Sequence, residues 1–215
     1  MRTSARHGAP SRPRLDKPIA FALCALPLAW LAVRAFELAG LTLGPNPVEA
    51  LIHGLGSWGL RLLLVTLCVR PLAVLLRQPR LMRLRRLTGL FAFTYLVLHF
   101  LAWLGIDQSF DARNVVTDIA KRPYVTVGFA ALLLLVPLAV TSTDGWMRRL
   151  GRRWQTLHRL VYPAALLGCL HFLWLVKADW REPALYIAIF ATLMAWRWRR
   201  YRRPAGRAAT ASAGR

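Results

Sequence analysis

The chain has 215 residues, of which 56% are hydrophobic and 18% are charged, and it carries a formal net charge of +21. Soluble domains are usually about 45–50% apolar and about 25% charged. The high apolar content excludes disorder over most of the chain. The long apolar runs also leave little room for the basic surface that a nucleic-acid-binding fold needs. The composition therefore indicates a small polytopic membrane protein with cations in its loops.

Six apolar segments approach the roughly 20 residues that a membrane helix needs. The sequence thus predicts an all-α fold, a polytopic bundle of six transmembrane helices. The expected spans are residues 18–40, 50–69, 87–106, 124–140, 154–176 and 184–198. They form one transmembrane domain, residues 18–200. A basic N-terminal tail (1–17) and a disordered tail (201–215) flank it.

Lysine and arginine are unevenly shared between alternate connections of these spans. The two tails and the second and fourth loops hold 22 of the thirty cations, and the other three connections hold five. Cytoplasmic loops of membrane proteins carry an excess of Lys and Arg. We therefore expect both termini and the even-numbered loops in the cytoplasm, and we read the positive charge as a topology signal.

Two histidines occupy similar depths in two spans of the same direction. His99 lies seven residues before the outer end of the third span, and His171 lies five before that of the fifth. At 1.5 Å per residue these positions are roughly 10 Å and 8 Å deep. Two imidazoles at one level can bind one metal ion from opposite sides, as in a bis-histidine heme site. The alternative for each is a structural hydrogen bond.

Residues near this pair could shape a heme pocket. Gly168, one turn before His171, leaves space for the edge of a flat macrocycle. Tyr95, four residues before His99, could wall the same pocket, and ordinary aromatic packing explains it equally well. His53 and Arg61 recur on one face of the second span. An arginine near mid-membrane needs an acceptor, such as a heme propionate, a quinone carbonyl or a backbone carbonyl.

His158 lies near the cytoplasmic end of the fifth span, 13 residues before His171. A second bis-histidine site would want a partner 13 residues before His99, where Arg86 stands. Three interpretations of His158 stay open: a ligand of a second heme, a neighbour of a quinone or flavin, or a hydrogen-bonding residue of the interface. The number of hemes, one or two, is open for the same reason.

Several strings of the sequence resemble the heme-binding membrane subunit of the bacterial periplasmic protein-methionine-sulfoxide reductase system. That subunit is part of the ferric-reductase-like transmembrane superfamily. The longest string is LGRRWQTLHRLVY at residues 150–162. The others are residues 85–90 leading to 98–99, 122–128, 141–143 and 171–174.

The resemblance implies a bacterial inner-membrane protein that holds b-type heme through His99, His171 and His158. It implies an electron-transfer subunit rather than a catalytic one. Electrons would come from the quinone pool and pass to a soluble periplasmic molybdopterin methionine-sulfoxide reductase, the catalytic partner in a heterodimer, which repairs oxidised periplasmic proteins. The resemblance also implies FMN, for which the sequence shows no motif.

Three alternatives remain at this stage. The chain could be a heme-free membrane anchor or assembly factor for a periplasmic enzyme. It could also be a conduit fed by a cytoplasmic flavin reductase docked on the basic loops. A small transporter built around Arg61 and His53 would need inverted repeats or broken helices, and we expect no internal repeat.

Overall fold

The computed structural model describes residues 16–176 and 179–202. All regular structure within these residues is helical, as the sequence predicts. The predicted basic tail and disordered tail lie outside the described residues, except where α1 and α9 extend into them.

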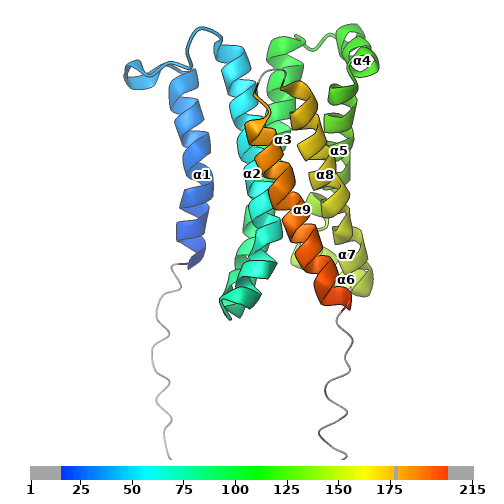
Figure 1. Ribbon diagram of the computed structural model, residues 1–215. Helices are drawn as coiled ribbons and strands as arrows, with labels where there is room; N and C mark the ends of the chain where they lie inside the picture. The colour runs from blue at the N-terminus through cyan, green and yellow to red at the C-terminus, as the bar shows by residue number, and fades with distance from the viewer. Residues whose placement is uncertain (1–15, 177–178, 203–215) are drawn as a thin grey trace, which may run out of the picture.

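Six long helices form a bundle (Figure 1). Its two best-packed pairs are α2 with α3 and α5 with α8, while α1 packs on α2 and α3, and α9 packs on α8 and α2. The six are α1 (Asp16–Ala35), α2 (Pro47–Leu75), α3 (Leu84–Ala102), α5 (Pro123–Val140), α8 (Val161–Leu175) and α9 (Arg181–Arg202).

Short helices make the connections between the long ones. Three of them begin or end at recognisable signals: Asp111 caps α4 by accepting from the Arg113 N–H at 2.8 Å, Thr143 caps α6, and Gly151 with φ of 50° separates α6 from α7. The short helices are η1 (Leu38–Gly40), η2 (Pro79–Arg83), the π-helical turn η3 (Trp103–Asp107), α4 (Ala112–Lys121), α6 (Asp144–Leu150), α7 (Arg152–Leu157) and η4 (His158–Leu160).

Four stretches of the described chain are long and apolar enough to cross a membrane, and they coincide with the first four predicted spans. They are Asp16–Ala35, Pro47–Leu75, Pro79–Asp107 and Pro123–Val140. The count of six is not confirmed by this measure. The fifth predicted span is divided between α7, η4 and the 15-residue α8, and the 22-residue α9 carries arginines in its last turns.

Small side chains allow close packing at the centre of the bundle. Ala92 of α3 and Ala164 of α8 have no exposed surface, and Leu63 and Leu67 of α2 are buried in the same core. Small residues let membrane helices approach closely, so van der Waals contact can hold the bundle together. Leu63 and Ala164 of this core also line the cavity described next.

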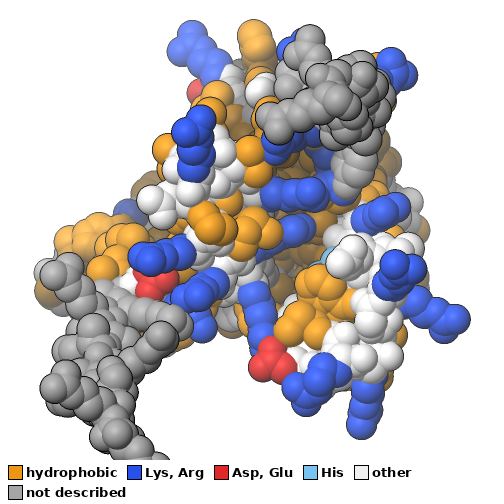
Figure 2. Space-filling view, turned by 90° about the horizontal axis from the view of Figure 1, so that it is seen from below, with side chains coloured by type: hydrophobic (Ala, Val, Ile, Leu, Met, Phe, Trp, Pro, Cys, Tyr) orange, Lys and Arg blue, Asp and Glu red, His pale blue; other side chains and the backbone are white. Residues whose placement is uncertain are grey.

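The basic residues gather at one end of the bundle. The first and last described residues lie at this end, and so do η2, α6 and α7 (Figure 1). The short helices η1 and α4 lie at the opposite end. Viewed from below, this face shows many Lys and Arg side chains and few acidic ones (Figure 2). The unequal charge of alternate connections in the sequence is therefore a real difference between the two ends.

Candidate functional site

A cavity of about 530 Å³ lies between α2, α3, α5 and α8, toward the end opposite the basic one. Its volume falls in the range of about 300–1,000 Å³ that is usual for ligand sites. Polar residues at the starts of α2 and α5 and the end of η3 form its rim: Asn46, Glu49, Asp107 and Arg122. The hydrogen bond to Tyr124 and the carboxylate of Asp118 raise the pKa of Arg122, so this rim cation stays charged.

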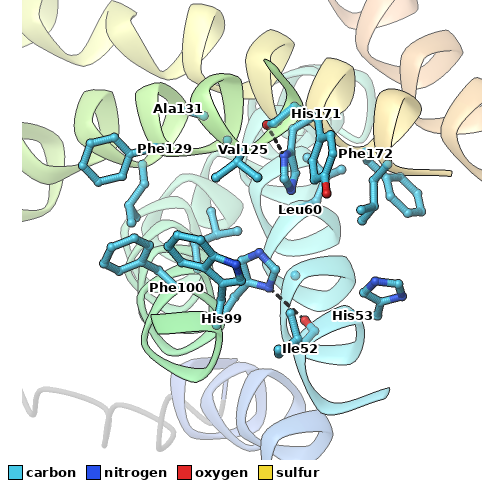
Figure 3. A pocket seen from close by; sticks show the side chains of 18 of the residues that line it. Ile52, His53, Leu60, His99, Phe100, Val125, Phe129, Ala131, His171 and Phe172 are labelled. Atoms are coloured by element: carbon cyan, nitrogen blue, oxygen red, sulfur yellow. Dashed lines mark hydrogen bonds between the residues drawn. The ribbon is translucent and has the colours of Figure 1, made fainter. Parts of the chain in front are cut away.

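His99 of α3 and His171 of α8 both project into this cavity (Figure 3). Their ring centres are 6.2 Å apart and their planes are inclined by 75°. An imidazole nitrogen binds a transition metal at about 2 Å, and its ring centre lies roughly 1 Å further, so two imidazoles on one ion have centres about 6 Å apart. The two histidines that the sequence places at one depth therefore lie next to each other, with ring centres at a distance compatible with a shared ion.

Backbone carbonyl groups fix the orientation of both rings. The Nδ1 atom of His99 donates to the Ile52 carbonyl at 2.8 Å, and that of His171 donates to the Tyr124 carbonyl at 2.7 Å. A carbonyl oxygen can only accept, so each Nδ1 carries a proton, and in the neutral ring each Nε2 then keeps its lone pair. A hydrogen bond of this kind on the second nitrogen is the usual support of a metal-binding histidine.

Glycines on the facing helices make room for both rings. A Cβ atom at Gly56 of α2 would lie 3.0 Å from His99 Nδ1, and one at Gly128 of α5 would lie 2.6 Å from His171 Nδ1. Both positions are in ordinary helical backbone, so the need for glycine here is one of space. Each imidazole therefore rests directly against the backbone of its neighbouring helix.

These elements occur twice, at a constant offset of 72 residues. Ile52, Gly56 and His99 correspond to Tyr124, Gly128 and His171, and the string LHFL occurs at residues 98–101 and 170–173. The expectation of no repeat is wrong in this respect. Helix α5 runs in the same direction as α2, and α8 runs in the same direction as α3 (Figure 1). The repeat is therefore parallel and differs from the inverted repeats of many transporters.

The donor set points to a metal held in a macrocycle. Within the described chain, no three His, Cys, Asp or Glu side chains gather as a metal site. The cavity thus offers two facing imidazoles, too few ligands to satisfy a bare first-row metal ion by themselves. Three phenylalanines that the sequence analysis did not single out line the cavity: Phe100, Phe129 and Phe172. Two of them belong to the repeated LHFL string, which is the signal that identifies them.

Two other predicted residues also line the cavity. A Cβ atom at Gly168 would lie 3.3 Å from Leu60 Cδ1, so glycine allows α8 to pack closely against Leu60 of α2. His53 lies near the start of α2, exposed and apart from the histidine pair (Figure 3). The structure therefore brings four of the predicted residues to one cavity: His53, His99, Gly168 and His171.

Tyr95 lies in the core instead of the cavity lining. It is fully buried, and its hydroxyl donates to the Cys24 carbonyl of α1 at 2.9 Å. Of the two interpretations of Tyr95, the structure therefore favours packing. Its contact attaches α1 to α3, so its influence on the cavity is indirect.

Arg61 also lies outside the cavity lining, and its acceptors come from α9. Its Nε donates to the Tyr186 hydroxyl and a terminal nitrogen donates to Glu182 Oε1, both at 2.6 Å, and its guanidinium lies 4.9 Å from the centre of the Trp58 ring. Tyr186 also donates to Glu182, again at 2.6 Å. Neither Tyr186 nor Glu182 was predicted from the sequence as a partner of Arg61. Their spacing of four residues on one helix face was the available signal.

His158 lies in η4, away from the cavity lining. Its Nδ1 donates to the Trp154 carbonyl at 3.1 Å, and its ring stacks on Trp154 with centres 3.8 Å apart. Its Nε2 is buried and has no hydrogen-bond partner in the described part of the chain. Because buried polar atoms normally have partners, this nitrogen is suited to bind a ligand.

Comparisons with known proteins identify the family of the chain. The family model of the ferric reductase like transmembrane component matches residues 55–169. Curated proteins named protein-methionine-sulfoxide reductase heme-binding subunit MsrQ are similar over most of the chain. That of Caulobacter vibrioides is 55% identical over 175 residues, covering 81% of this chain and 82% of the relative.

Two further relatives with the same name are nearly as similar. The protein of Rhodospirillum rubrum is 51% identical over 187 residues, 86% of this chain and 88% of the relative. That of Xanthomonas axonopodis pv. citri is 51% identical over 170 residues, 79% and 78%. No solved structure matches the chain. The chain therefore belongs to the ferric reductase like transmembrane family and, within it, to the MsrQ proteins.

Proposed function

We propose that this protein is a heme-binding membrane subunit that carries electrons to a methionine-sulfoxide reductase. The observation that carries the proposal is the pair His99 and His171, with ring centres 6.2 Å apart and both Nδ1 atoms hydrogen-bonded to carbonyls. The names of the curated relatives, heme-binding subunits of protein-methionine-sulfoxide reductase, support the same assignment.

The residues present fit heme b. His99 and His171 would hold the heme iron, and Gly168 and the phenylalanines would line the pocket around the group. Heme iron supplies one-electron redox chemistry by alternating between the ferric and ferrous states. The chain itself holds both imidazoles with a proton on Nδ1 and surrounds them with mostly apolar side chains. His53 is placed to contact the outer edge of the site.

His158 is a third candidate for a residue that would hold heme iron. Its unpartnered, buried Nε2 supports this role, while its position outside the cavity lining separates it from the pair His99 and His171. Whether the chain binds one heme or two depends on this residue. Arg61 and Tyr95 would act on the site only through α9 and α1, which they attach to the bundle.

The charge distribution supports a direction for electron flow. With six spans in a bacterial inner membrane, the basic end and both termini would face the cytoplasm, and the cavity would lie near the periplasmic surface. The polar rim there would face the periplasmic molybdopterin reductase subunit, and the quinone pool would supply electrons. FMN stays a prediction from the resemblance alone, and we assign no residue to it.

An absorption spectrum tests the heme assignment. Purified protein reduced with dithionite should show the bands of ferrous b-type heme, and His99→Ala or His171→Ala should remove most of them. His7→Ala, a histidine of the basic tail, is the matched control and should leave heme content unchanged. Wild-type heme in both cavity variants would overturn the assignment of these ligands.

A second experiment tests the partner. Reduced protein in detergent should be reoxidised when a periplasmic methionine-sulfoxide reductase and methionine sulfoxide are both added, and not when either is omitted. Reoxidation at the same rate without the reductase would contradict electron delivery to that partner.

A further inference from the structure

A second cavity, of about 220 Å³, opens at the basic end of the bundle where α2, α3, α8 and α9 meet. Its lining residues include no carboxylate in the described chain. Four of them are arginines: Arg70 of α2, Arg85 of α3, and Arg197 and Arg200 of α9. Such a concentration of positive charge among helices favours the binding of an anion.

The lining is divided by depth into a cationic half and an apolar half. Both α2 and α9 run toward the basic end, so residues earlier in each helix lie deeper in the bundle (Figure 1). Leu67 comes three residues before Arg70, and Leu193 comes four before Arg197, with Met194 beside it. The deep part of the cavity is therefore apolar, and its opening is cationic. This is the polarity of an amphiphile lying in the inner leaflet.

Aromatic residues order the arginines at this opening. Arg197 donates to the Tyr162 hydroxyl and lies 4.4 Å from the centre of its ring, and Arg200 lies 5.2 Å from the centre of the Trp196 ring. Nearby, Asp144 of α6 pairs with Arg86, which is outside the lining. Asp144 is therefore engaged by an arginine outside the cavity lining.

We propose that this cavity binds the phosphate of an anionic glycerophospholipid. Guanidinium groups match phosphate oxygens in geometry and charge, and basic pockets between membrane helices are known to hold lipid headgroups. The glycerol and the first acyl carbons would lie against Leu67, Leu193 and Met194. Free inorganic phosphate shares the charge but would leave this apolar half unfilled. The proposal does not depend on heme.

Native mass spectrometry of the full chain in detergent tests the site. Wild-type protein titrated with phosphatidylglycerol should retain one lipid, and Arg70→Gln/Arg200→Gln should bind it about 30-fold more weakly. Arg148→Gln/Arg149→Gln removes the same charge from α6 at the same end and should bind like wild type. Phosphatidylcholine should not be retained. Equal loss in both double variants, or equal retention of phosphatidylcholine, would overturn the proposal.

Competition separates the lipid from its headgroup chemistry. Inorganic phosphate at the same concentration should fail to displace phosphatidylglycerol, and displacement would show a site for a free anion instead. A second measurement needs no arginine variant. Phosphatidylglycerol with brominated acyl chains should quench Trp196, which lines the cavity, and Trp196→Phe should remove that part of the quenching. Equal quenching in wild type and Trp196→Phe would contradict a lipid in this cavity.

Discussion

The α2–α3 pair and the α5–α8 pair hold a histidine in the same way but differ one turn before it. In α3 that position is Leu96, which packs into a gap at Gly59 of α2, and in α8 it is Gly168, which faces Leu60 of α2. Helix α2 thus packs against the histidine-bearing helix of both halves of the repeat, the α2–α3 pair and the α5–α8 pair. The presentation of the imidazole is therefore repeated, whereas the packing one turn before it is adapted to α2.

Removing either histidine is expected to have the largest effect. If the two halves contribute one ligand each, His99→Ala and His171→Ala should lose heme to the same extent, and the double variant should lose little more. Heme per protein, measured from the reduced spectrum, checks this. A large additional loss in the double variant would mean that each histidine works separately.

The two glycines that support the rings should respond unequally. A Cβ at residue 128 comes closer to its histidine than one at residue 56, at 2.6 Å against 3.0 Å. We expect Gly128→Ala to destabilise the protein by about 3 kcal/mol and Gly56→Ala by about 1 kcal/mol, through overpacking. Thermal unfolding and heme content in one detergent measure both. The reverse order would show that the second half is the more adaptable.

The contact that attaches α1 offers a smaller effect. Tyr95→Phe removes a buried hydrogen bond to the Cys24 carbonyl and should cost about 1 kcal/mol of unfolding free energy. Because Tyr95 does not line the cavity, the heme spectrum should be unchanged. A shifted heme spectrum would indicate that Tyr95 contacts the heme pocket.

The ion pair that attaches α9 should matter least. The side chains of Arg61 and Glu182 are 39% and 45% exposed within the protein. Exposed ion pairs usually contribute less than about 1 kcal/mol. A double-mutant cycle of Arg61→Gln and Glu182→Gln, followed by thermal unfolding, should give a coupling below that value. A much larger coupling would indicate that lipid shields the pair from water.

The sequence predicted the features that depend on local pattern. The length of the apolar runs predicted the four spans that the structure also contains. The similar depth of His99 and His171 in their spans predicted that the two rings are neighbours. Prediction from the sequence failed where the outcome depends on how distant helices meet. Glu182 reaches Arg61 across 121 positions of the chain, and the register of two helices that sets this contact has no local signal. Tyr95 shares a face with His99, yet its long side chain reaches α1.

The repeat shows the same limit. The string LHFL is visible twice, but Ile52 and Tyr124, or Leu96 and Gly168, share no chemistry that a comparison of sequences would detect. At positions 52 and 124 the two halves share only the location of a backbone carbonyl group, and every residue has such a group.

That choice of acceptor has a consequence for how the protein can vary. Because a main-chain oxygen orients each imidazole, these two hydrogen bonds do not depend on which side chains stand at positions 52 and 124. A neutral acceptor also gives less electron density to the ring than a carboxylate would. A more electron-rich imidazole would therefore require a new acidic side chain near each ring, since the acceptor already present belongs to the main chain.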